Sequence, residues 1–167
     1  VLDYAHAFGW RDRSPDLAAL TAKALPRQPE RDGHHAAVSY ADAPAVLERL
    51  LAERGSVGRL ALLFTVLTAA RSGETRGATW GEIDFDAATW RIPGDRMKRG
   101  KPHVVPLSAL ALALLERMAK ARRTDSSSEL IFPGLRHDRP LSDMTMAKVH
   151  KSAAPGTTVH GWRSTFR

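Results

Sequence analysis

Three short stretches of the sequence carry basic residues of the types that bind phosphate. Arg71 directly follows the apolar run that ends in "LTAA", and Lys98 lies in "RMKRGK" between two expected strands. Near the end of the printed sequence, "HGWR" places His160 and Arg163 about one helical turn apart. Each stretch alone has an ordinary structural explanation: a cation at a helix end, a solvated hairpin cation, and a chance pairing.

Together, these four residues predict a cationic pocket for a single phosphate group. A guanidinium group can donate two parallel hydrogen bonds to two oxygens of one phosphate, and it stays charged at any working pH. A phosphoryl group in transfer gathers negative charge on its equatorial oxygens, and fixed cations stabilise that charge. The sequence has no Asp/Glu cluster with the spacing of a two-metal nuclease, and its histidines form no zinc-ligand set. We therefore expect neither a metal nor another cofactor.

The distribution of charge indicates a polyanionic partner. Residues 1–90 hold 10 Lys/Arg and 12 Asp/Glu, whereas residues 91–167 hold 15 Lys/Arg and 6 Asp/Glu. A net charge of −2 on one part and +9 on the other favours nucleic acid bound by one face, although a solvated basic surface is the alternative. The chain has no cysteine, no signal peptide pattern, and no apolar run long enough to cross a bilayer. We expect a cytoplasmic protein without a membrane partner.

The pattern of apolar residues predicts a mainly α fold with a small three-stranded antiparallel sheet, an α+β class. Residues 1–25 are predicted to end a helical unit, 26–37 to form a polar linker, and 38–167 to form the main domain. Asp42, Ser56 and Ser108 are predicted helix N-caps, and the helix after Ser56 is apolar almost all round, as a central core element should be. Short β-branched and aromatic segments within 82–108 predict the strands.

These segments, in this order, resemble the tyrosine recombinases, and most closely the phage-type integrases of prophages and genomic islands. "LTAARSGETRGATWGEIDFDAATWRIPGDRMKRGKPHVVPLS" resembles the first catalytic box followed by the lysine hairpin, and "VHGWRSTFR" resembles the second box. "VLDYAHAFGW" resembles the end of the core-binding domain. The resemblance implies a tyrosine recombinase catalytic domain, incomplete at its C-terminus.

The resemblance implies a role for each matching residue. Arg71 and Arg163 would hold the scissile phosphate, Lys98 would protonate the departing 5′ oxygen, and His160 would assist proton transfer. Glu74 would support the site by orienting a basic neighbour, although an ordinary first-turn carboxylate is the alternative. The remaining hairpin cations, Arg96, Arg99 and Lys101, are predicted to contact DNA.

The nucleophile of the family is a tyrosine beyond the second box, and no matching tyrosine is present in this chain. Its two tyrosines, Tyr4 and Tyr40, both lie far upstream. The resemblance implies that the full-length protein recombines double-stranded DNA at attachment sites through a 3′-phosphotyrosyl intermediate, as a tetramer. We expect this chain alone to bind DNA at most. The alternatives are a non-catalytic DNA-binding protein with the same fold, and a type IB topoisomerase.

Overall fold

A computed structural model describes residues 2–10, 12, 35–52, 55–97, 100–122, 128–135 and 139–166 of the chain. The chain divides into two units, residues 1–32 and 33–167. The first contains helix α1 (Leu2–Ala7), after which Gly9 adopts a positive φ of 71°. Tyr4, Phe8 and Trp10 pack against one another there, with ring centroids 4.4 to 5.9 Å apart. Most of the predicted linker, residues 26–34, lies outside the described residues.

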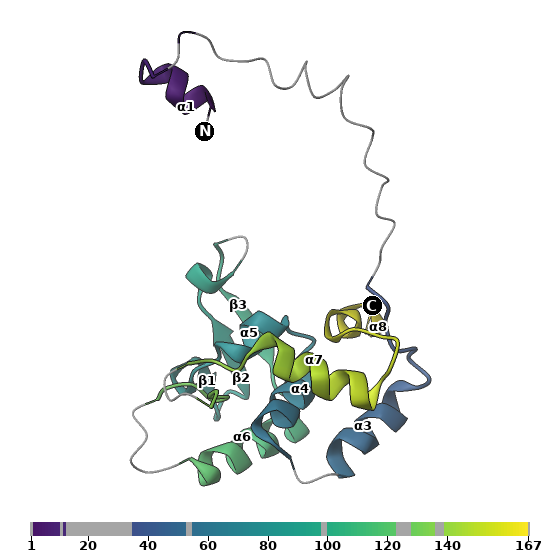
Figure 1. Ribbon diagram of the computed structural model, residues 1–167. Helices are drawn as coiled ribbons and strands as arrows, with labels where there is room; N and C mark the ends of the chain where they lie inside the picture. Colours follow the sequence, from purple (N-terminus) through teal and green to yellow (C-terminus); the bar gives the residue numbers. More distant parts are fainter. Residues whose placement is uncertain are drawn as a thin grey trace. The chain divides into compact units, whose positions relative to one another are not determined.

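The second unit is built around helix α4 (Val57–Thr68), which begins where the hydroxyl of Ser56 accepts the N–H of Arg59 at 3.3 Å. Its apolar side chains from Leu60 to Val66 are buried, as predicted for the central element. Around it lie α3 (Ala43–Ala52), α5 (Ser72–Arg76), α6 (Ala109–Ala121) and α7 (Asp143–Ala153), all of which contact α4 (Figure 1). The core therefore has α4 at its centre.

The sheet has three antiparallel strands in sequence order: β1 (Ile83–Asp84), β2 (Thr89–Ile92) and β3 (His103–Pro106). Trp90 pairs with Ile83 on one side and with Val105 on the other. Because side chains alternate along a strand, Trp90 and Ile92 are buried while Arg91 is exposed. Trp90 packs on Phe64 of α4, with ring centroids 5.2 Å apart, so the sheet rests on the central helix. The predicted α+β fold class is confirmed.

Side-chain caps define the start of the remaining helices. The hydroxyl of Ser108 accepts the N–H of Ala111 at the start of α6, as predicted, and Ser142 caps α7 in the same way. Asp42 precedes α3, and its carbonyl accepts the N–H of Val46. Its side chain, however, accepts the Ser39 hydroxyl at 2.6 Å, and Ser39 in turn caps the Asp42 N–H. These two bonds tie Asp42 to the turn that precedes α3.

The segment of residues 35–38 packs against the end of the described chain. There, the single turn η3 (Val159–Gly161) leads into α8 (Trp162–Thr165). The Ala36 carbonyl accepts the Thr158 N–H at 2.9 Å, and the Val38 carbonyl accepts the Thr165 hydroxyl at 2.7 Å. Trp162 is buried in the core and anchors α8. Among the described helices, none is both long and apolar enough to span a membrane.

Candidate active site

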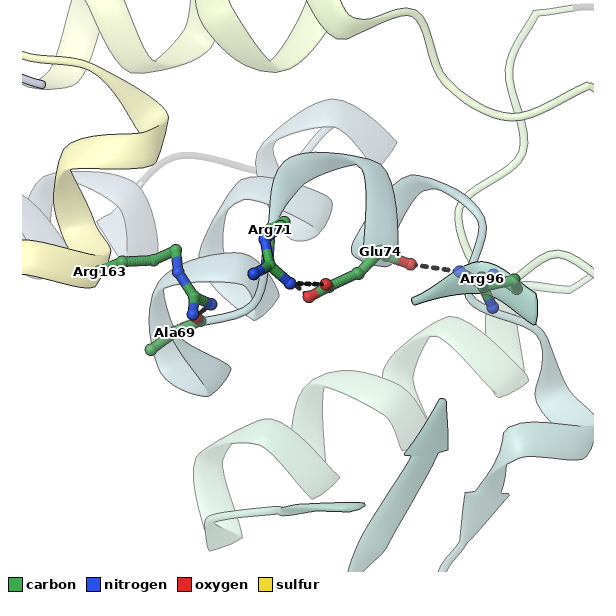
Figure 2. Close-up of polar contacts among 5 residues, drawn as sticks. All are labelled: Ala69, Arg71, Glu74, Arg96 and Arg163. Carbon is green, nitrogen blue, oxygen red and sulfur yellow. Dashed lines mark hydrogen bonds and ion pairs between the residues drawn. The ribbon is translucent and has the colours of Figure 1, made fainter. Parts of the chain in front are cut away.

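Arg71 lies at the junction between α4 and α5. Ala69 ends α4 in the left-handed conformation, with φ 49° and ψ 26°, and turns the chain so that Arg71 precedes the first turn of α5. Glu74 accepts the Arg71 backbone N–H at 2.9 Å and pairs with its guanidinium at 2.5 Å (Figure 2). The Arg71 side chain is 42% exposed, and that of Glu74 only 7%. The buried carboxylate thus holds an arginine that still reaches solvent.

Arg163 comes to the same place from α8. Its guanidinium donates to the carbonyl of Ala69, the residue that ends α4 (Figure 2). The left-handed turn at Ala69 frees this carbonyl from the helix ladder, so it can accept from a distant side chain. The junction after α4 therefore places Arg71 directly and gives Arg163 an anchor.

These side chains line a pocket of about 270 Å³. Its walls come from the α4–α5 junction, from both sides of the β2–β3 hairpin and from α8, and its lining residues are Thr68, Ala69, Ala70, Arg71, Glu74, Met97, His103, Val105 and Arg163. Other hollows in the described part, of about 180, 300 and 530 Å³, are lined mainly by apolar groups and contain none of the predicted site residues. The sequence-predicted Arg71, Glu74 and Arg163 thus share one polar pocket.

His160 lies beside this pocket, on η3. The His160 side chain is largely exposed, and the pKa of its imidazole is lowered first by partial desolvation and then by the positive charges of His35, Arg163 and Arg71. The ring of His35 lies against it, with centroids 4.4 Å apart. Sequence reasoning placed His35 in the linker and missed this contact, because nothing local connects residues so far apart in the chain. A neutral His160 at working pH can accept a proton.

The predicted hairpin cations differ in their surroundings. Lys98 and Arg99 lie outside the described residues, and their roles stay predictions. Lys101 is exposed, as a DNA contact requires. Arg96 is bonded within the protein: its guanidinium pairs with Glu82 and donates to the Glu74 carbonyl at 2.6 Å. Within the described ranges, no three His, Cys, Asp or Glu side chains converge as a metal site would need.

Comparison with known proteins defines the class. Residues 43–166 match the Phage integrase family, and the chain belongs to that family. It is 37% identical over 142 residues to prophage integrase IntZ of Escherichia coli (strain K12), a match that covers 81% of this chain and 34% of IntZ. It is 33% identical over 186 aligned positions to the integrase of Enterobacteria phage P4, covering 100% of this chain and 40% of that protein. The chain spans about a third to two fifths of the length of these relatives.

The fold agrees with this membership. A lambda integrase tetramer bound to a Holliday junction has a similar fold, with a TM-score of 0.61 and 21% identity over 98% of this chain and 48% of that chain. The resemblance to the tyrosine recombinases is thereby confirmed at the level of family and fold.

Proposed function

We propose that the full-length protein is a site-specific DNA recombinase that integrates DNA by metal-independent strand cleavage and rejoining. The observation that carries this proposal is the shared pocket of Arg71 and Arg163, which reach it from two segments far apart in the sequence. Two guanidinium groups at the wall of one polar hollow suit a single phosphate, because each offers paired donors to its oxygens.

In the proposed reaction, a tyrosine hydroxyl attacks the scissile phosphorus and the bond to the 5′ oxygen breaks. The products are a 3′-phosphotyrosyl linkage and a free 5′-hydroxyl, and the reverse reaction with another strand rejoins the DNA. Arg71 and Arg163 stabilise the charge on the equatorial oxygens. Lys98 gives the leaving oxygen its proton, and the neutral His160 takes the proton of the attacking phenol.

We place the nucleophilic tyrosine outside this chain, since the relatives are much longer and neither Tyr4 nor Tyr40 has the matching sequence context. This chain alone then binds DNA without cutting it. By analogy with the lambda integrase tetramer on its junction, we propose that the full-length protein acts as a tetramer on double-stranded attachment sites, in the cytoplasm.

Covalent trapping of the full-length protein tests this function. A duplex that spans the attachment junction, with a nick just 3′ to the cleavage position, loses its short 5′-hydroxyl product and leaves a protein–DNA adduct that survives detergent. We expect the adduct with the native protein. With Arg71→Ala or Arg163→Ala it should form about 10²–10³ times more slowly. Arg117→Ala, which removes an exposed arginine of α6, serves as the matched control.

Two results would contradict the proposal. Native protein that binds the duplex but forms no adduct would be a non-catalytic DNA-binding protein. An adduct without strand exchange between two sites, together with relaxation of supercoiled DNA of any sequence, would indicate a type IB topoisomerase.

A further inference from the structure

Arg96 lies just after β2, at the base of the loop that joins β2 to β3, which we call the hairpin neck. Both terminal nitrogens of its guanidinium are bonded within the protein. Arg96 belongs to the single turn η2 (Gly94–Arg96), which follows β2. One terminal nitrogen pairs with the Glu82 carboxylate. The other donates to the Glu74 backbone carbonyl at 2.6 Å, as Figure 2 shows. The Arg96 side chain is only 24% exposed, and that of Glu82 is 10% exposed. Because its guanidinium is largely covered by the protein, Arg96 is poorly placed to contact a phosphate of the DNA backbone.

Glu82 forms an ion pair with Arg96 and is also bonded to the sheet. It belongs to the turn η1 (Trp80–Glu82), and its second oxygen accepts the indole N–H of the buried Trp90 at 2.8 Å. A carboxylate that leaves water needs a cationic partner as well as hydrogen bonds. Arg96 supplies that charge, so the pair joins the hairpin neck to the turn before β1.

The fold leaves room for the Arg96 side chain at Gly77, the residue that ends α5. A Cβ atom on Gly77 would lie 2.8 Å from a terminal nitrogen of Arg96. The backbone of Gly77, with φ −95° and ψ 9°, is open to other residues, so its conformation does not call for glycine. A side chain at this position would instead have to displace the Arg96 guanidinium from its place.

The bonds continue from Arg96 to the phosphate pocket. Arg96 holds the backbone of Glu74, while the side chain of Glu74 holds both the backbone N–H and the guanidinium of Arg71. We propose that Arg96 is a positioning residue: it locks α5 against the hairpin neck and thereby fixes Arg71, and it does not contact DNA. This inference rests on the proposed function for the part that concerns catalysis. Lysine cannot replace Arg96 in this role, because a single ammonium group lacks the planar guanidinium that reaches two acceptors.

The decisive variant is Arg96→Lys in the full-length protein, because it keeps the positive charge. If Arg96 is a positioning residue, Arg96→Lys should leave the DNA affinity unchanged. The slope of log affinity against log salt should also stay the same. Cleavage at saturating DNA should fall about tenfold to a hundredfold, the scale of a small misplacement of a catalytic group. Gly77→Ala, which alters no charge, should reproduce the effect, whereas Arg117→Ala should leave cleavage unchanged.

Two outcomes would overturn the inference. One is cleavage at the native rate by Arg96→Lys. The other is a salt slope for Arg96→Ala that is smaller by about 0.9, the value for one lost phosphate contact. If Arg96→Ala does not fold, Arg96→Lys and Gly77→Ala still decide the matter.

A readout that needs no activity separates this inference from the proposed function. The guanidinium ¹⁵N signals of Arg71, assigned with Arg71→Lys, report its ion pair with Glu74. They should shift in Arg96→Lys and Gly77→Ala and stay in place in Arg117→Ala. Unchanged signals in the first two variants would refute the positioning role, whereas native protein that fails to cleave DNA would refute only the proposed function.

Discussion

Gly161 offers a direct test of how η3 and α8 are held against residues 35–38. Its backbone is helical, with φ −57° and ψ −30°, so alanine would meet no conformational obstacle. A Cβ atom there would nevertheless lie 2.2 Å from the Ala36 carbonyl oxygen and 2.8 Å from the Ala37 Cα. Both are backbone atoms, and residues 35–38 are tied down by the bonds from Thr158 and Thr165. Gly161→Ala must therefore displace one segment from the other.

The cost of this displacement can be estimated from its parts. Forcing a methyl group into a packed site costs about 1–3 kcal/mol. Losing the hydrogen bond between Thr158 and Ala36 costs about 1 kcal/mol. Alanine in a helical backbone returns about 0.5–1 kcal/mol relative to glycine. We expect Gly161→Ala to lower the free energy of unfolding by about 1–3.5 kcal/mol, the combined range of these three contributions.

Urea unfolding of the full-length protein, followed by tryptophan fluorescence, measures the effect. The matched control is Gly73→Ala in α5, where the nearest atom to a new Cβ is 4.0 Å away. Gly73→Ala should raise the free energy of unfolding by about 0.5–1 kcal/mol. If Gly161→Ala proves as stable as the native protein, residues 35–38 do not pack on η3 as described.

Three further predictions concern single groups and the charge of the domain. His150 is 2% exposed, and burial lowers its pKa below the ordinary 6.5. The stabilising contribution of the neutral His150 should be fully present above pH 6.5 and should decline as the pH falls from 6.5 to the lowered pKa of the folded state. Urea unfolding midpoints measure this decline, and it should be smaller in His150→Leu. Lys98→Ala should cleave ordinary DNA slowly, and a 5′-bridging sulfur, which leaves without a proton, should restore its rate; native-rate cleavage of ordinary DNA would instead make Lys101 the candidate acid. Duplex affinity of this chain should fall steeply between about 50 and 200 mM salt, and a flat response would contradict the polyanion interpretation.

The parts of the fold that the sequence predicted are those with local causes. Ser56 and Ser108 cap the helices that follow them because a serine oxygen reaches only the next turn of the chain. The strand containing Trp90 was predicted because its segment is short and rich in β-branched and aromatic residues. Arg71 was found from its place directly after the apolar helix.

The parts that escaped prediction depend on contacts between distant segments. His35 lies against His160, and no sequence spacing indicates such a contact. Arg96 is a hairpin arginine like its neighbours in the sequence, and only the space at Gly77 and the partly buried Glu82 turn it inward. The left-handed turn at Ala69 also lacked a signal, since glycine is the usual residue there.

The central claim is that Arg71 and Arg163 neutralise the charge of one scissile phosphate. A methylphosphonate at that position tests it most directly, because a methyl group replaces one nonbridging oxygen and removes the charge. On ordinary DNA, the full-length Arg71→Ala and Arg163→Ala variants should cleave about 10²–10³ times more slowly than the native protein. On the methylphosphonate, most of that difference should disappear. An equal loss on both substrates, or no loss on ordinary DNA, would contradict the account.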